Sequence, residues 1–501
     1  MVHARNIGLR KMVAIGIVAA MGVLTACAGG NGGGDSGESA AGEQPKSSTS
    51  DTPTPAAGET APQPEVYENG LPKDEKVTLK VGFFVGGYGR DWFDYAVESF
   101  TEKYPNVSFD ITASPDLKNL LSTKISAGND EDMFDMFNTA PPGGVVSLAE
   151  AGKLEEMGDI WDYPLPDVPG EKVKDRMLAG MYESTPLIDG KMYEFTTASS
   201  FGGLFFNKAL FEKNGWNQNP KTWAEFEALL ADIKADGIIP ITFPGVHPSY
   251  HSWAFGPAKM FELADMNGTV DEFIERYKTY GLPEFTSPEQ VEVWTRIYEL
   301  GKKGYFAEGL PALTHTQSQM QVIQGQAAMV STGSHVENEM KEATPADFQW
   351  GYMAVPFREN ADQTLWIRSG TSNFNYIWAA KPELNKKWAK EFIVWTLTLE
   401  NQQFAAEKSG ALPMRKDLIE DPAKTANLST SAQSILKYIG DNNAHTYKAS
   451  RSVSISDPNL AQANKLLDEN IVKFALGMQE PKPILEEAEE LLKKALEAEQ
   501  K

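Results

Sequence analysis

The segment VTLKVGFFVGGYGRDWFDYAVESFTEKY, residues 77–104, carries the pattern from which the fold class follows. Apolar residues alternate with other residues from Val77 to Val85, a period that predicts a β-strand. A glycine-rich run at 86–89 ends this strand, and residues 91–104 have the apolar spacing of an amphipathic helix. We therefore expect a strand, then a loop whose backbone can approach another group closely, then a helix.

Strands and helices alternate in the same way farther along the chain. Thr222 and Glu225 have the spacing of a capping box, which predicts a helix that begins at Trp223 and closes near Gly237, before a strand in IIPITF. Ser287 precedes a proline at the first helical position and predicts a second helix of this kind. This alternation favours an α/β architecture in which helices cover both faces of the sheets.

The composition excludes several classes of function. The 501-residue chain has a formal net charge of −23 at pH 7, which argues against nucleic acid or an anionic lipid surface as a partner. Its single cysteine is Cys27, so the folded part is expected to contain no disulfide, no cysteine metal site and no thiol nucleophile.

The N-terminal region has the features of an export signal. Arg5, Arg10 and Lys11 precede the apolar run MVAIGIVAAMGV, which is too short to span a bilayer but suits a secretory signal. The following LTAC resembles a bacterial lipobox, which predicts a lipoprotein signal peptide at 1–26 and lipid attachment to Cys27. Residues 27–75 are rich in Gly, Ser, Thr and Pro and are expected to form a flexible tether.

Sequence signatures of catalysis are scarce. The chain contains no phosphate-binding G-x-x-x-x-G-K-[ST] loop, no H-E-x-x-H zinc helix and no G-x-S-x-G nucleophile elbow in its folded part. His247 and His251 are four residues apart, but Pro248 disturbs helical registration and no neighbouring Cys or acidic residue completes a ligand set. We therefore expect neither an enzyme nor a metal or cofactor site.

Several blocks of sequence resemble the family 1 extracellular solute-binding proteins, the sugar-capturing lipoproteins of bacterial ABC importers. The main block is DGKMYEFTTASSFGGLFFNKALFEKNGW followed by PKTWAEFEALLADIKADGIIPITFPG, of which Asn207 and residues 220–223 are the most specific parts. Other blocks agree in order: LLSTKISAGNDEDMFDMFNT, GQAAMVSTGSH, MAVPF and KKWAKEFIVWTLTLENQQFAAEKSGALPMRKD. The resemblance extends from about Val77 to the C-terminal helix.

This resemblance implies an α/β, two-lobed fold of the type II periplasmic-binding-protein kind, with the ligand cleft between the lobes. Residues 76–198 and 360–408 would form the first lobe, and residues 199–357 and 410–497 the second. The expected partners are a carbohydrate and the transmembrane permease subunits of an ABC transporter. The protein would be a monomer held by its lipid at the extracytoplasmic face of the cell membrane.

Candidate ligand-binding residues occupy positions that match the family's ligand loops. Hydroxyl groups of a sugar need polar side chains, and the apolar face of a pyranose ring packs on aromatic rings. The candidates are Gly86, Gly87, Tyr88, Asn138, Thr139, Ser200, Phe201, Tyr250, His251, Trp253, Ser334 and His335. For any single aromatic residue among them, notably Phe201 and Trp253, packing in the core is the alternative role.

The chain departs from the family pattern at two positions. Phe134 and Asp135 stand where the family usually has Pro-Asp, and Asp135 could serve to cap a turn. His335 stands where many members have a stacking tryptophan, which puts the usual malto-oligosaccharide preference in doubt. A histidine there could instead form a hydrogen bond with a hydroxyl or with the carboxylate of a uronate.

Three functional hypotheses follow. Capture of a carbohydrate for an importer is the best supported. The others are a surface-tethered carbohydrate-active enzyme on a similar frame, and a binding protein of the same fold for a solute such as a polyamine, a metal chelate or a peptide.

Overall fold

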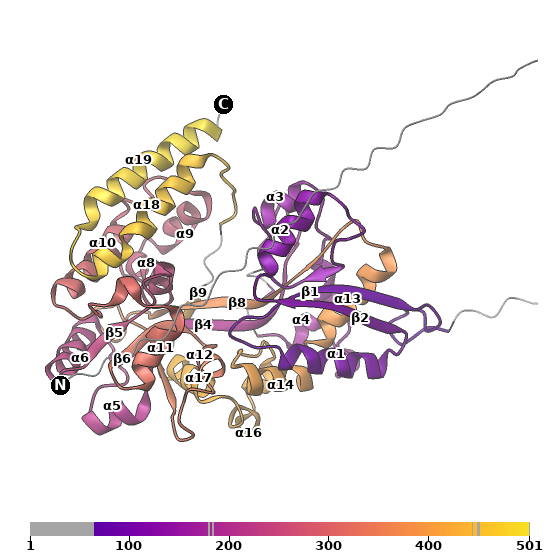
Figure 1. Ribbon diagram of the computed structural model, residues 1–501, viewed down its shortest axis with the longest axis horizontal. Coiled ribbons are helices and arrows are strands. Elements are labelled where there is room, and N and C mark those ends of the chain that lie inside the picture. The colour runs from indigo at the N-terminus through magenta and orange to yellow at the C-terminus, as the bar shows by residue number, and fades with distance from the viewer. Residues whose placement is uncertain (1–64, 179–180, 183–184, 443, 448–450, 500–501) are drawn as a thin grey trace, which may run out of the picture. The chain divides into compact units, whose positions relative to one another are not determined.

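The computed structural model describes residues 65–178, 181–182, 185–442, 444–447 and 451–499 (Figure 1). The predicted signal peptide, Cys27 and most of the predicted tether lie outside these residues. From residue 65 onward the chain forms one compact unit. Within the described residues, no helix is both long enough and apolar enough to cross a membrane.

A sheet of nine strands runs through this unit in the order β2-β1-β3-β8-β4-β6-β5, with β7 paired to β4 and β9 paired to β8. The strands are β1 (Val77–Phe84), β2 (Val107–Ser114), β3 (Met136–Phe137), β4 (Phe195–Asn207), β5 (Ile239–Thr242), β6 (Ala327–Gly333), β7 (Trp350–Met353), β8 (Trp366–Ile377) and β9 (His445–Tyr447). β1 is parallel to both β2 and β3, and β5 is parallel to β6. The long strands β4 and β8 are antiparallel and connect these two parallel groups.

Helices pack around each of the two parallel groups. The first group has α1 (Asp91–Lys103), α2 (Leu117–Ala127), α3 (Val145–Glu150), α4 (Val173–Arg176), α13 (Glu383–Trp395) and α14 (Leu399–Ser409). Around the second lie α5 (Lys208–Asn214), α6 (Trp223–Ala235), α7 (Ser252–Phe255), α8 (Pro257–Met266), α9 (Val270–Thr279), α10 (Pro288–Lys302), α11 (His315–Ile323), α12 (Val336–Glu339), α15 (Lys416–Ile419), α16 (Pro422–Thr425), α17 (Thr430–Asn442), α18 (Pro458–Ala475) and α19 (Pro481–Glu499). Figure 1 shows α18 and α19 side by side. The 3-10 helices are η1 (Gly158–Asp162), η2 (Pro248–His251) and η3 (Leu310–Ala312).

The predicted strand, loop and helix at 77–104 are present as β1, a turn and α1. The helix buries Trp92, Phe93, Ala96 and Phe100, which recur at helical spacing on one face. The helix at 223–235 is also confirmed, and the Thr222 side chain accepts a hydrogen bond from the Glu225 backbone N–H. The Glu225 carboxylate accepts from the backbone N–H of Lys221, one residue before the position that a capping box requires.

Two large hydrophobic cores define a first and a second lobe. One core contains buried residues between Leu71 and Phe195 and again between Ile377 and Met414. The other contains buried residues between Phe201 and Ile367 and again between Ala406 and Ala495. Ile367 on β8 lies in the second core, although the sequence places residues from 360 onward in the first lobe. The reason is that β8 crosses from one lobe to the other.

The C-terminal end of the predicted tether is packed, which corrects the expectation that residues 65–75 are flexible. Leu71 is buried in the first core, and the hydroxyl of Tyr67 donates to Asn106 Oδ1 at 2.9 Å. The Tyr67 ring packs edge-on against Tyr104 and Trp388. Tyr67 and Leu71 thus bury enough apolar surface to order a segment whose composition is otherwise that of a linker.

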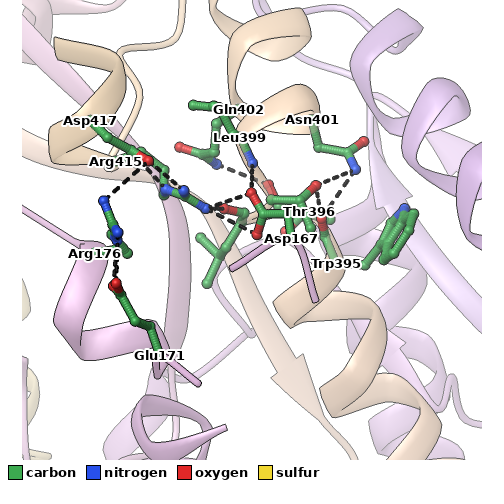
Figure 2. Close-up of polar contacts among 12 residues, drawn as sticks. Asp167, Glu171, Arg176, Trp395, Thr396, Leu399, Asn401, Gln402, Arg415 and Asp417 are labelled. Carbon is green, nitrogen blue, oxygen red and sulfur yellow. Dashed lines mark hydrogen bonds and ion pairs between the residues drawn. The ribbon is translucent and has the colours of Figure 1, made fainter. Parts of the chain in front are cut away.

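Residues 410–415 also pass between the two cores and are fixed by a polar network (Figure 2). Leu412 pairs with Ser199 of β4 and belongs to the second core, whereas Met414 belongs to the first. The Arg415 side chain is fully buried and donates to Asp417 at 2.6 and 2.9 Å and to Asp167 at 3.0 Å. Asp167 lies in the first lobe, so this network ties the crossing segment to that lobe.

Candidate functional site

Two loops of the first lobe leave the sheet at the same edge. β1 and β3 are parallel neighbours, with Gly82 paired to Phe137, so the loops that follow them emerge together. The loop after β1 carries Gly86, Gly87 and Tyr88, and the loop after β3 carries Asn138 and Thr139. The side-chain Oδ1 of Asn138 accepts a hydrogen bond from the Phe84 backbone N–H at 2.6 Å, which fixes one loop to the other.

Two segments of the second lobe are arranged by the same rule. β5 and β6 are parallel, with Ile241 paired to Met329, and their C-terminal ends lead into η2 and into the loop before α12. The Ser331 hydroxyl donates to the Tyr250 carbonyl at 2.7 Å, so η2 is fixed against β6. Tyr250 follows β5, and His335 follows β6.

These segments enclose a pocket of about 500 Å³ to which both lobes contribute. It is lined by Phe83, Phe84, Gly86, Gly87, Tyr88, Gly89, Trp92, Asn138, Thr139, Ala140, Ser200, Tyr250, Trp253, His315, His335, Glu339 and Phe374. A larger hollow of about 840 Å³ is lined by residues from Phe206 to Asp441, all of the second lobe, so it cannot hold a solute between the lobes.

Most of the candidate ligand residues line this pocket. They are Gly86, Gly87, Tyr88, Asn138, Thr139, Ser200, Tyr250, Trp253 and His335. Trp253 packs against Arg368, whose guanidinium carbon lies 4.2 Å from the ring centroid and which also donates to the Ser252 hydroxyl. The ring is therefore fixed in place at the pocket wall, as a stacking surface needs to be.

Three of the candidate residues do not line the pocket. Phe201 is buried in the second core. His251 is also buried, with its Nδ1 donating to the Pro248 carbonyl at 2.9 Å and its ring packed on Trp294; burial lowers its pKa to about 4. Ser334 is buried, although its hydroxyl lies 3.2 Å from the Tyr88 hydroxyl. All three are next to lining residues in sequence, since Phe201 follows Ser200, His251 follows Tyr250 and Ser334 precedes His335.

Several lining residues were not identified from sequence. His315 lies on α11, and Glu339 ends α12 four residues after His335. The spacing of His335 and Glu339 on a helical turn was a usable signal, whereas His315 is brought close only by tertiary structure. Trp92 and Phe374 are apolar residues whose sequence environment resembles that of the core.

The two lobes touch at the edge of the pocket. Asn338 Nδ2 donates to the Gly87 carbonyl at 2.8 Å, and Tyr88 and Ser334 share the hydroxyl contact described above. A Cβ atom on Gly87 would lie 2.8 Å from His335 Cδ2. Glycine at this position therefore allows the first-lobe loop to lie against the second lobe, a close approach of the kind that the glycine-rich run predicts.

His315, His335, Gln319 and Glu339 form a polar cluster on the second-lobe wall. His315 Nε2 donates to Glu339 Oε2 at 2.7 Å, Gln319 Nε2 donates to the same oxygen at 2.9 Å, and His335 Nε2 lies 3.9 Å from it. Burial opposes ionisation of Glu339, but the hydrogen bonds from His315 and Gln319 hold its pKa below the ordinary value. Burial lowers the pKa of His335 to about 4, so its ring is neutral at neutral pH.

Among the residues that the structure places around this pocket, Glu339 is the one acidic side chain, and no lysine or arginine lines it. Burial, followed by the nearby Glu339 carboxylate, raises the pKa of Tyr250 to about 12, so its hydroxyl stays protonated. The wall thus offers aromatic faces, hydroxyls, one amide, two imidazoles and one carboxylate. Such a site can hold a polyol by stacking and hydrogen bonds, and it contains little that would stabilise an anion.

The fold and this pocket together define a two-lobed solute receptor. Residues 95–430, about two thirds of the chain, match the family of bacterial extracellular solute-binding proteins. The chain belongs to this family, whose members bind solutes and are not enzymes.

Known relatives agree with this assignment. The diacetylchitobiose-binding protein NgcE of Streptomyces coelicolor is 25% identical over 273 residues, 54% of this chain and 55% of the relative. The sn-glycerol-3-phosphate-binding periplasmic protein UgpB of Brucella abortus is 26% identical over 370 residues, 70% of this chain and 75% of the relative. The chain spans little more than half the length of the first of these relatives.

Solved structures share the fold. A chitin oligosaccharide binding protein superposes with a TM-score of 0.64 at 22% identity, over 84% of this chain and 99% of that chain. The solute-binding protein RafE in complex with raffinose superposes with a TM-score of 0.62 at 18% identity, over 84% and 100%. The prediction of a two-lobed α/β solute-binding fold is confirmed.

Proposed function

We propose that this protein captures a neutral carbohydrate, a mono- or oligosaccharide, and delivers it to the permease of an ABC transporter. The observation that carries the proposal is the pocket itself. Aromatic rings from both lobes, including Tyr88, Tyr250 and Trp253, meet hydroxyl and amide groups in a volume of about 500 Å³. Sugars need both kinds of wall, because a pyranose has an apolar face and a rim of hydroxyls.

The charge of the pocket favours an uncharged sugar over an anionic solute. One relative is named for diacetylchitobiose and another for sn-glycerol-3-phosphate. A phosphate in this pocket would face the Glu339 carboxylate without a lining lysine or arginine to pair with it. The same carboxylate, 3.9 Å from His335, also disfavours the uronate that His335 could otherwise accept. The chemistry therefore resembles that of the first relative more than that of the second.

The other two hypotheses have less support. An enzyme would need a nucleophile or an acid–base pair with separate roles, and the one carboxylate of the pocket is already engaged by His315 and Gln319. A polyamine is compatible with Glu339, but the many hydroxyl and aromatic groups would have no matching function in such a solute. A carbohydrate uses all of them.

Calorimetric titration of wild type and three variants tests the proposal. Diacetylchitobiose, raffinose, maltose and sn-glycerol-3-phosphate are first screened by thermal shift, and the best sugar is then titrated into Tyr88→Ala, Tyr250→Ala and Tyr298→Ala. Loss of a stacking or hydrogen-bonding ring costs about 1 to 3 kcal/mol, or about ten- to hundredfold in affinity. We expect this loss of affinity in Tyr88→Ala, a change in the first lobe, and in Tyr250→Ala, a change in the second lobe.

Tyr298 on α10 lies outside the pocket, and its variant serves as the matched control, with affinity unchanged. Weakened binding in only one of the two pocket variants would show that the solute is held by one lobe. A thermal shift with sn-glycerol-3-phosphate and with none of the sugars would reject the carbohydrate proposal.

The proposal extends to location and organisation. We infer that a lipid on Cys27 anchors the protein at the extracytoplasmic face, that 27–64 is the tether, and that the folded protein acts as a monomer. The lipobox-like LTAC and the linker composition support this part. The lobe boundary at 198/199 and the nine pocket-lining candidate residues are also part of the proposal, and the other two crossings between the lobes are placed within β8 and within residues 410–415.

A further inference from the structure

Three side chains of the second-lobe wall converge in a way that neither sugar binding nor packing requires. The donor atoms of His315, His335 and Glu339 all lie within 4.8 Å of one another. The sequence predicts no metal site, because its one closely spaced histidine pair, His247 and His251, has no further ligand nearby. In the structure, His251 is buried and forms a hydrogen bond with the Pro248 carbonyl. His315 and His335 are instead brought together by the packing of α11 against β6.

The distances suit a small metal ion. Both imidazole Nε2 atoms face the same carboxylate oxygen, His315 at 2.7 Å and His335 at 3.9 Å from Glu339 Oε2. In a tetrahedral zinc site with bonds of about 2.0 to 2.1 Å, donor atoms are separated by about 3.3 Å. The observed separations lie on both sides of this value, so side-chain shifts of about 1 Å would bring the three donors into tetrahedral positions.

We propose that His315, His335 and Glu339 bind a divalent transition-metal ion of the Zn²⁺ class, with the open coordination position facing the solute pocket. All three side chains line that pocket, so a fourth ligand would come from it.

The donor set selects the class of ion. Two imidazole nitrogens and one carboxylate oxygen suit Zn²⁺, Co²⁺, Ni²⁺ or Cu²⁺, whereas Ca²⁺ and Mg²⁺ require oxygen ligands in greater number. Gln319 Nε2 donates to Glu339 Oε2 at 2.9 Å and orients the carboxylate, as an outer partner does in metal sites. The side chains are only partly exposed, at 18% for His315, 11% for His335 and 25% for Glu339, so they are held in place by their surroundings.

A bound divalent ion would reverse the charge of the pocket. The three ligands carry one negative charge, so the loaded site would carry one positive charge and would attract hydroxyl, carboxylate or phosphate oxygens. The metal-binding proposal does not depend on the solute, because its primary readout is the ion itself. Metal binding can therefore be disproved while the proposed sugar binding stands, and sugar binding can be disproved while metal binding stands.

The test is titration of Co²⁺ into the full chain, prepared without a histidine tag and carrying Cys27→Ala so that no thiol can bind the ion. We expect one equivalent of Co²⁺, visible absorption of a four-coordinate site, and displacement by Zn²⁺. The variants His315→Ala, His335→Ala and Glu339→Gln should each weaken binding by about 100-fold or more, at least the loss seen when an outer partner is removed.

His247→Ala is the matched control, because His247 is an exposed histidine outside the pocket, and it should bind like the parent. Melting in chelator verifies that each variant is folded, and Glu339→Gln, which keeps the size of the side chain, remains informative if a histidine variant does not fold. Co²⁺ binding that is absent in the parent, or equal in the parent and Glu339→Gln, would overturn the site.

Discussion

Histidines of identical chemistry have different roles here because of what surrounds each ring. His251 and His335 follow neighbouring strands, and burial lowers the pKa of both to about 4. His251 faces Trp294 and the Pro248 carbonyl, which is the environment of a core residue. His335 faces Glu339, Tyr88 and Trp253, which line the pocket between the lobes. Residue type alone does not distinguish them.

The depressed pKa of His251 predicts a pH-dependent stability. The ring is neutral in the folded protein down to about pH 4, whereas in the unfolded chain it takes up a proton near pH 6.5. The unfolded state thus binds more protons in this window, so stability is lost as the pH falls from 6.5 towards 4. Between pH 7 and pH 5 this loss is about 2 kcal/mol.

Chemical unfolding of wild type and His251→Gln at pH 7 and pH 5 measures this effect. The wild type should lose about 2 kcal/mol more than the variant over this interval. His335 and the carboxylates are present in both proteins, so their contributions cancel in the difference. Equal losses would show that His251 is protonated in the folded state at pH 5.

At the scale of elements, the pocket lies at the C-terminal ends of parallel strands, and the segments that cross between the lobes connect one lobe to the other. Tyr88, Asn138, Tyr250 and His335 each follow the C-terminal end of a strand that has a parallel neighbour. The crossing at 410–415 depends instead on the buried Arg415 and its two aspartates (Figure 2). A guanidinium can bond both carboxylates at once because its donors form a planar fork.

Arg415→Ala should destabilise the protein by about 3 kcal/mol, the lower part of the range for a broken buried ion pair, because Asp167 and Asp417 remain about a quarter exposed. Urea unfolding at pH 7 measures the change. Lys437→Ala is the control, since Lys437 is 75% exposed and forms an i,i+4 pair with Asp441 on α17, and it should change stability by less than about 0.5 kcal/mol. A similar small change for both variants would mean that the network does not fix the crossing.

At the scale of the whole molecule, we propose that Cys27 and the tether determine where the receptor works. The described residues contain no helix that could cross a membrane. The lipobox-like LTAC is what makes Cys27 the proposed site of a lipid anchor, and burial of its acyl methylenes would retain the protein on the membrane.

Replacement of Cys27 by Ala in the native host should release the protein from the membrane fraction and remove the acyl mass, as judged by fractionation and mass spectrometry. Sugar affinity of the released protein should equal that of the wild type, because the pocket residues from 83 to 374 are unchanged. Wild-type protein that stays on the membrane without an acyl group would contradict the lipoprotein proposal.

The sequence by itself determined the class of fold, the main helices and strands, and the loops that carry the pocket. Local periodicity and capping are read directly from neighbouring residues, so β1, α1, α6 and α10 could be predicted. Family resemblance added nine of the pocket-lining positions. The order at 65–75 was missed because Tyr67 and Leu71 are ordered by residues far along the chain, among them Trp388.

Only the tertiary structure decided which side chains of those loops face the pocket. Ser334 and His335 are adjacent, as are Tyr250 and His251, and in each pair one member lines the pocket while the other does not. The sequence also does not predict that His315 lies close to His335 and Glu339, because this proximity depends on how α11 packs against β6. Contacts between residues distant in sequence arise from packing of whole elements, which local patterns do not specify.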